Sequence, residues 1–224
     1  MTLRSDSTLR AVSFDVGGTL IEPWPSVGHV YAEIAAQHGA PGLSPQLLNE
    51  RFKTAWRSCK DFDYTRVGWE NLVQQTFAGL IPSAVSFFPE LYERFTEPEA
   101  WQVFDDVRPT LDKLAEEEIR LVVISNWDDR LRPLLKRLKL DQYFESLIVS
   151  CEVGFAKPSP IIFEQAASRL GLAPGDILHV GDSAEMDLRG ARAAGFQAIQ
   201  LKRGEEAKSP DVITSLAELR ISGY

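Results

Sequence analysis

The sequence contains little cysteine and no long apolar run. Its two cysteines, Cys59 and Cys151, are too few for a disulfide framework, so we expect a protein of a reducing compartment. Residues 1–10 are polar, and no segment offers the roughly 20 consecutive apolar residues that a transmembrane helix needs. Neither a secretory leader nor a membrane anchor is predicted. We therefore expect a cytoplasmic protein with no membrane partner.

Positive charge is also scarce. The 224 residues include 24 Lys and Arg against 32 Asp and Glu, which gives a net charge of −8. Proteins that bind nucleic acid need a basic surface, so this balance argues against such a partner. A small phosphorylated substrate remains compatible with it, because only the local site must attract the phosphate. The length allows either one core domain with a modest second unit or one large domain.

Two patterns of secondary structure follow one another along the chain. Residues 10–21 resemble a strand and a turn, and residues 23–104 show helical periodicity in four segments without a β-branched run. From residue 107 onward, helical segments alternate with short strands that are apolar on both faces, and a last helix is expected after residue 211. Such strands are typical of a parallel sheet between two helix layers. We predict an α/β fold with a Rossmann-like parallel core at 1–21 and 105–224, and an inserted α-helical domain at 22–104.

Polar residues stand at the ends of the predicted strands. Asp15 ends the first strand in VSFDVGGTLIE, Ser125 and Asn126 follow VVI, and Asp182 follows LHVG. Lys157 lies in the loop segment GFAKPSP, and Asp187 lies five residues beyond Asp182. Any one of them alone is typical turn chemistry. Because ligands of such sheets collect at the carboxyl ends of the strands, together they predict one site.

The charges of this set indicate its chemistry. Three carboxylates, those of Asp15, Asp182 and Asp187, would meet one obvious cation, Lys157, and like charges that close repel one another. A hard divalent cation with oxygen ligands relieves that repulsion, which predicts Mg²⁺ as cofactor. A carboxylate beside Mg²⁺, with a lysine and the Ser125 hydroxyl converging on it, is suited to phosphoryl transfer.

Four segments in order, DVGGTL, ISN, KPSP and GDSAEMD, resemble the haloacid dehalogenase superfamily of aspartyl-nucleophile hydrolases. The resemblance covers essentially the whole chain, with the helical insertion as a type 1 cap. It implies that Asp15 is the nucleophile, Ser125 a hydrogen-bond donor to the transferred group and Lys157 an electrostatic clamp. The implied metal ligands are Asp15, the Gly17 carbonyl and Asp182, with Asp187 supporting the metal shell. The implied phosphate-binding residues are Thr19, Ser125, Asn126 and Lys157.

Gly17 departs from the pattern of the family's phosphatases, which carry a second aspartate there as general acid and base. A missing group of this kind costs roughly 10²–10⁴ in rate. Three alternatives to a full phosphatase stay open: a weak, phosphate-binding pseudo-enzyme, a metal-free 2-haloacid dehalogenase, and a phosphonate-cleaving enzyme that uses a cap lysine, Lys53 or Lys60. The acidic GDSAEMD segment favours a metal site over the dehalogenase.

Several other polar and aromatic residues lie near these motifs. His179 lies within the strand ILHVGD, where we expect it to pack as a strand residue. Trp24 and Trp127 each follow a motif by a few residues, and packing is the expected role of both. Four residues could replace the missing aspartate as an acid, and the spacing singles out none of them: Glu22, Asp63, Asp128 and Asp129.

Overall fold

The computed structural model describes residues 9–59, 62–207 and 209–221, and the chain divides into two compact units. The first consists of Met1–Ile21, Val103–Arg132 and Lys139–Tyr224, and the second of Glu22–Gln102 and Pro133–Leu138. The division predicted from the sequence differs from these units at residues 103–104 and at Pro133–Leu138. Among the helices of the described residues, none is long and apolar enough to cross a lipid bilayer.

The first unit is built on a six-stranded sheet in the order β5-β4-β1-β6-β7-β8, and every adjacent pair is parallel. The strands are β1 (Ala11–Phe14), β4 (Arg120–Ser125), β5 (Ser146–Val149), β6 (Ile177–Gly181), β7 (Gln197–Leu201) and β8 (Val212–Ile213). All residues of β1 and β6 are buried, as expected of central strands covered on both faces. The predicted parallel α/β fold is confirmed.

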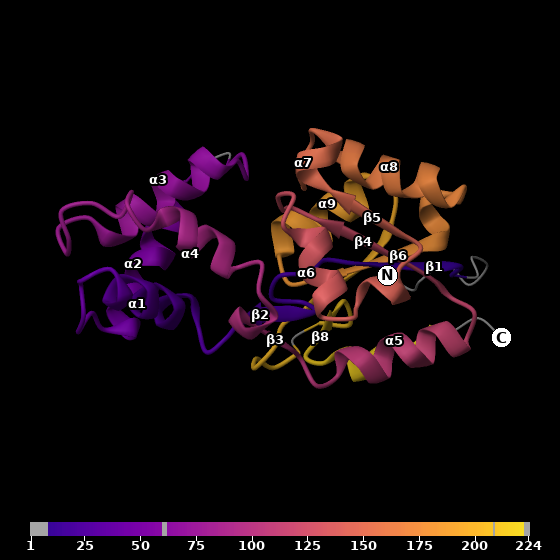
Figure 1. Ribbon diagram of the computed structural model, residues 1–224. Helices are drawn as coiled ribbons and strands as arrows, with labels where there is room; N and C mark the ends of the chain where they lie inside the picture. Colours follow the sequence, from indigo (N-terminus) through magenta and orange to yellow (C-terminus); the bar gives the residue numbers. More distant parts are fainter. Residues whose placement is uncertain (1–8, 60–61, 208, 222–224) are drawn as a thin grey trace. The chain divides into compact units, whose positions relative to one another are not determined.

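Helices cover both faces of this sheet. They are α5 (Val107–Glu116), α7 (Ser150–Val153), α8 (Pro160–Leu170) and α9 (Gly190–Ala193), and a π-helical turn at Ala184–Arg189 leads into α9. Helix α6 (Leu131–Arg137) begins in this unit, and its residues from Pro133 onward belong to the second. Helices α8 and α9 lie against one face and α5 against the other (Figure 1). Phe163 of α8 packs in a cluster with Val122 and Ile124 of β4, which anchors the helix to the centre of the sheet.

The second unit is helical, as its sequence pattern predicts. It contains α1 (Val27–Gln37), α2 (Pro45–Ser58), α3 (Arg66–Phe77) and α4 (Phe88–Arg94). Side chains of Ser26, Ser44 and Thr65 accept backbone N–H groups at the starts of α1, α2 and α3, so capping residues define these helix starts. Tyr31 and Phe77 stack with their ring centroids 5.6 Å apart in an apolar core.

Three local predictions from the sequence are corrected or extended by the structure. The expected last helix is wrong for the described residues: the segment instead forms β8 and a 3-10 turn at Leu216–Glu218, because Asp106 accepts the backbone N–H of Leu216 and fixes the turn there. The predicted strand SLIVSCE ends at Val149. A short ribbon of β2 (Ile21–Pro23) and β3 (Trp101–Val103) was not predicted.

Candidate active site

Asp15 stands directly after β1, where the chain turns sharply. Its backbone N–H bonds the carbonyl of Val180 on β6, and the next turn is closed by hydrogen bonds to the carbonyl of Val16. Gly18 adopts φ +73°, and a Cβ there would lie 2.6 Å from Oδ2 of Asp182. Glycine is therefore required at position 18 for two reasons, the left-handed backbone and the close approach of a carboxylate.

Lys157 is the buried cation of the site. Its Nζ lies 2.7 Å from Oδ1 of Asp15 and 2.5 Å from Oδ1 of Asp187. The loop that carries it is fixed by Asn126, whose side-chain amide donates to the Lys157 carbonyl and accepts from the Lys157 N–H, at 2.9 and 2.6 Å. The Asn126 side chain thus positions the lysine, whereas its implied contact with phosphate stays a prediction.

Ser125 ends β4 beside Asp15. Its hydroxyl donates to Oδ1 of Asp15 at 2.9 Å, and the residue is 1 % exposed. The same carboxylate oxygen therefore receives two donors, the Ser125 hydroxyl and the Lys157 ammonium. This contact joins residues 110 positions apart in the sequence, and it results from the pairing of β1 with β4.

Asp187 is held by donors on both of its oxygens. Oδ1 accepts from Lys157 and, at 3.0 Å, lies against Nε2 of His179, while Oδ2 accepts the backbone N–H of Ser183 at 2.9 Å. A Cβ at Gly181 would lie 2.2 Å from Cγ of Asp187, so only glycine leaves room for this carboxylate at the end of β6. Asp187 consequently acts on the site mainly by fixing Lys157.

His179 extends this chain of contacts into the sheet. It is fully buried on β6, and its Nδ1 lies 2.8 Å from Oγ of Ser13, its register partner on β1. Burial lowers the pKa of His179 and outweighs the neighbouring Asp187 carboxylate, so the ring is neutral. With Nε2–H donating to Asp187, Nδ1 accepts from the Ser13 hydroxyl. The sequence indicated this link only through two polar residues in otherwise apolar strands.

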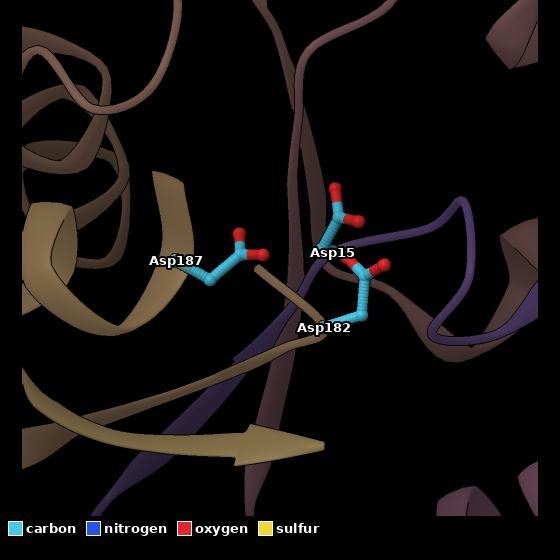
Figure 2. A group of neighbouring side chains, drawn as sticks. All are labelled: Asp15, Asp182 and Asp187. Atoms are coloured by element: carbon cyan, nitrogen blue, oxygen red, sulfur yellow. The ribbon is translucent and has the colours of Figure 1, made fainter. Parts of the chain in front are cut away.

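Three carboxylates gather around Lys157. One oxygen from each of Asp15, Asp182 and Asp187 lies within 4.8 Å of the others, and Figure 2 shows Asp187 pointing toward the other two. Burial of its carboxyl group, reinforced by repulsion from Asp15 and Asp187, raises the pKa of Asp182 to about 7, although the residue as a whole is exposed. The cluster therefore carries more negative charge than Lys157 neutralises.

Burial opposes ionisation of the lysine and of both buried carboxyl groups, and the charges of the neighbours decide the outcome for each. For Lys157, the carboxylates of Asp15 and Asp187 overcome burial and raise its pKa. For Asp187, Lys157 and His179 overcome burial and lower its pKa. For Asp15, burial prevails over Lys157 and the pKa is raised. Lys157 is therefore charged at neutral pH.

The donor set fits a hard divalent cation. Grouped carboxylate oxygens are the ligands that Mg²⁺ prefers, and a cation would relieve the repulsion from Asp15 and Asp187 that, after burial, raises the pKa of Asp182. Asp187 already accepts three donors, which leaves Asp15 and Asp182 as the better direct ligands. The Gly17 carbonyl remains a predicted third ligand.

Gly17 lies against an aromatic ring. Its φ is not positive, since Gly18 alone takes the left-handed conformation in this turn. A Cβ at position 17 would lie 3.2 Å from Cζ3 and 3.8 Å from Cη2 of Trp127. The indole therefore crowds the position where a side chain at residue 17 would begin.

The remaining candidates are placed as follows. Thr19 is fully buried, and among the described residues its hydroxyl has no hydrogen-bond partner, so its implied phosphate contact stays a prediction. Asp128 pairs through both oxygens with Arg130 at 2.6–3.0 Å, which removes it from the surrogate acids. Lys53 is exposed on α2 and pairs with a glutamate of the same helix, and Lys60 lies outside the described residues.

The likeness to known proteins agrees with the four motifs. A family model for haloacid dehalogenase-like hydrolases matches residues 9–195. The chain is 32% identical to haloacid dehalogenase-like hydrolase domain-containing protein 3 of Bos taurus, over 94% of this chain and 88% of that protein. It is 30% identical to human N-acylneuraminate-9-phosphatase, over 86% and 82%. The crystal structure of an HAD phosphatase from Thermococcus onnurineus superposes with a TM-score of 0.67 at 27% identity, covering 93% of this chain and 95% of that one. The resemblance seen in the motifs is confirmed, and the chain belongs to the haloacid dehalogenase-like hydrolase family.

Proposed function

We propose that this hydrolase is an Mg²⁺-dependent phosphatase that acts on a small phosphomonoester through an aspartyl-phosphate at Asp15. The observation that carries the proposal is the pair of donors on one oxygen of the nucleophile: Lys157 at 2.7 Å and Ser125 at 2.9 Å from Oδ1. Relatives named as phosphatases, among them N-acylneuraminate-9-phosphatase, support the reaction class. By the family resemblance, we propose the helical second unit as the cap.

The first step transfers the phosphoryl group to Asp15. In the described part of the chain both donors bind Oδ1, so we assign the attack on phosphorus to Oδ2. The bond from phosphorus to the leaving oxygen breaks, and that oxygen departs with the electron pair. Lys157 has three N–H donors, of which Asp15 and Asp187 take two, and the third can donate to a phosphoryl oxygen.

Bound by Asp15, Asp182 and the Gly17 carbonyl, Mg²⁺ would neutralise charge on the phosphoryl oxygens. The protein's own residues position Lys157. Asn126 and Asp187 hold the backbone and the ammonium of Lys157, respectively, so the cation is in place before substrate binds.

The second step returns Asp15 to its carboxylate. Water attacks phosphorus, the bond from phosphorus to the Asp15 oxygen breaks, and the electron pair stays on the carboxylate. The proton of the water passes to the phosphate that leaves or to solvent. With Gly17 in place of the usual aspartate, no carboxylate at position 17 removes that proton, so we expect this step to be slow.

A phosphate-binding protein with negligible turnover is the second candidate, and Gly17 is the observation that favours it. A metal-free haloacid dehalogenase is disfavoured by the acidic cluster. Without a cation, the carboxylates of Asp182 and Asp187 would repel both the Asp15 carboxylate and an anionic haloacid.

A substrate panel on the full chain tests the proposal. Aryl phosphate and 2-haloacid hydrolysis are measured with Mg²⁺ and with EDTA, for the wild type, Asp15→Asn and the matched control Asp105→Asn, an exposed aspartate of the same unit. We expect Mg²⁺-dependent phosphate release that Asp15→Asn abolishes and Asp105→Asn leaves unchanged. Full activity of Asp15→Asn, or halide release in EDTA, would overturn the proposal.

A further inference from the structure

We propose that Trp127, lying against Gly17, restricts this site to phosphoryl donors whose leaving group needs no proton, namely acyl phosphates and aryl phosphates. The inference rests on the proposed phosphatase function and names its substrate class. It follows from position 17, where this chain has glycine in place of the aspartate of the family's phosphatases, and from the Trp127 ring beside it.

The backbone does not require glycine at position 17. The left-handed residue of this turn is Gly18, so at position 17 the φ angle allows any L residue. The constraint is the indole: a Cβ would approach Cζ3 of Trp127 to 3.2 Å, which is closer than an ordinary van der Waals contact. Any side chain at position 17 therefore has to displace the ring by a few tenths of an ångström.

The backbone that carries Trp127 is fixed by its neighbours. Its N–H donates to the hydroxyl of Ser150 at 3.0 Å, and its carbonyl accepts from that hydroxyl and from the N–H of Cys151, at 3.1 and 3.3 Å. Ser150 is itself 5 % exposed at the end of β5. These contacts fix the backbone of Trp127, from which its side chain reaches Gly17.

The other ionisable groups around Asp15 have different tasks. Asp187 accepts Lys157, His179 and the Ser183 N–H, and Asp182 is the proposed metal ligand. Lys157 donates to two carboxylates and stays charged. As a ligand of Mg²⁺, Asp182 has to be ionised, so in the metal-bound site none of these described groups offers a proton to a leaving oxygen.

Leaving-group chemistry then selects the substrate. When Oδ2 of Asp15 attacks phosphorus, the leaving oxygen takes the electron pair of the broken bond and departs as an anion. A carboxylate leaves easily, because its conjugate acid has a pKa of about 4, and a phenolate, at about 10, leaves less easily. An alkoxide, whose conjugate acid is far weaker than a phenol, requires help from a general acid, and none of the described residues that contact Asp15 supplies one in the metal-bound site.

The test compares acetyl phosphate, phenyl phosphate and glycerol 3-phosphate under Mg²⁺, with the Asp15→Asn rate subtracted as background. For the wild type we expect kcat/KM to fall in that order by at least tenfold at each step. We expect Gly17→Asp alone to raise glycerol 3-phosphate turnover less than threefold. Gly17→Asp combined with Trp127→Ala should raise it at least tenfold more, because the carboxylate then has room. Trp127→Leu, also combined with Gly17→Asp, provides a second version should the alanine variant not fold.

A stability cycle gives a readout that is independent of turnover. Gly17→Ala should lower the melting temperature in the Trp127 background and not in the Trp127→Ala background. Gly175→Ala is the matched control, since Gly175 has an ordinary φ and nothing within 4 Å of its added Cβ. Gly175→Ala should change the melting temperature by the same amount in both backgrounds.

The outcomes separate the two proposals. Similar kcat/KM for all three substrates, or full gain from Gly17→Asp with Trp127 in place, would overturn the role of Trp127 while leaving the phosphatase intact. An additive stability cycle would also overturn the contact on which the inference depends. No turnover of any of the three, with no Asp15-dependent phosphoryl-enzyme, would overturn the proposed function and this inference with it.

Discussion

Replacing Lys157 by methionine should destabilise the first unit by an amount that shrinks in acid. The Nζ of Lys157 is the shared partner of two buried carboxylates, at 2.7 Å from Asp15 and 2.5 Å from Asp187. Methionine keeps much of the volume but removes the charge. Removing one partner of a buried ion pair costs about 3–5 kcal/mol, because the remaining charge is left without compensation. At about 2–4 °C per kcal/mol, the melting temperature at pH 7.5 should fall by on the order of 10 °C.

The sign of the pH dependence follows from which groups titrate between pH 5.5 and 7.5. In the wild type Lys157, whose pKa is raised, is charged throughout, and Asp187, whose pKa is lowered, is ionised throughout. Neither changes the wild-type stability in this window. Asp182, whose pKa is raised to about 7, titrates there in both proteins, so the comparison uses the difference between them. Without the lysine, the pKa of Asp15 and Asp187 should rise far above the unfolded value of about 3.9. The folded variant then binds more protons than the unfolded chain, so it becomes more stable as the pH falls.

The assay is thermal unfolding in EDTA at pH 5.5 and 7.5, for the wild type and Lys157→Met. The matched control is Lys113→Met. Lys113 is an exposed lysine of α5 that lies 3.7 Å from Glu117, and its loss should cost less than about 1 kcal/mol at either pH. The difference between wild type and Lys157→Met should be clearly smaller at pH 5.5. An equal loss at both pH values, or a loss no larger than that of the control, would refute the buried charge cluster.

Three further predictions concern the metal, the acidic cluster and the turn after β1. Mg²⁺ at a hundredfold excess over Kd should stabilise the wild type by about 2.7 kcal/mol, and Asp182→Asn should abolish this shift in a thermal melt. Because the pKa of Asp182 is raised to about 7, the metal-free protein should gain on the order of 1 kcal/mol as the pH falls from 8 to 5, and the Asn variant should lose this gain. Arg203 pairs with Asp106 through two 2.9 Å contacts and donates to the carbonyl of Thr19 at 2.7 Å, so Arg203→Ala should cost on the order of 2 kcal/mol in urea unfolding. An exposed control, Arg189→Ala, should cost under about 0.5 kcal/mol.

The fold follows from the sequence where the local signal is strong. The strands around Val122 and Val180 are short, apolar on both faces and separated by amphipathic helices, so burial permits little besides a parallel sheet. The signal fails where tertiary contacts set the conformation. The ribbon of β2 and β3 pairs segments about eighty residues apart, and the last 3-10 turn depends on Asp106, which no local pattern reveals.

The sequence by itself determined the residues that meet at the site. Asp15, Ser125 and Asp182 stand at strand ends that must lie at one edge of a parallel sheet, and Lys157 and Asp187 lie in segments beyond such ends. Only the tertiary structure decided what those residues do to one another. The pairing of Ser13 with His179 depends on the register between β1 and β6. The contact of Trp127 with Gly17 depends on side-chain packing between two loops. Both join positions more than a hundred residues apart, and sequence spacing carries no information on such distances until the sheet fixes them.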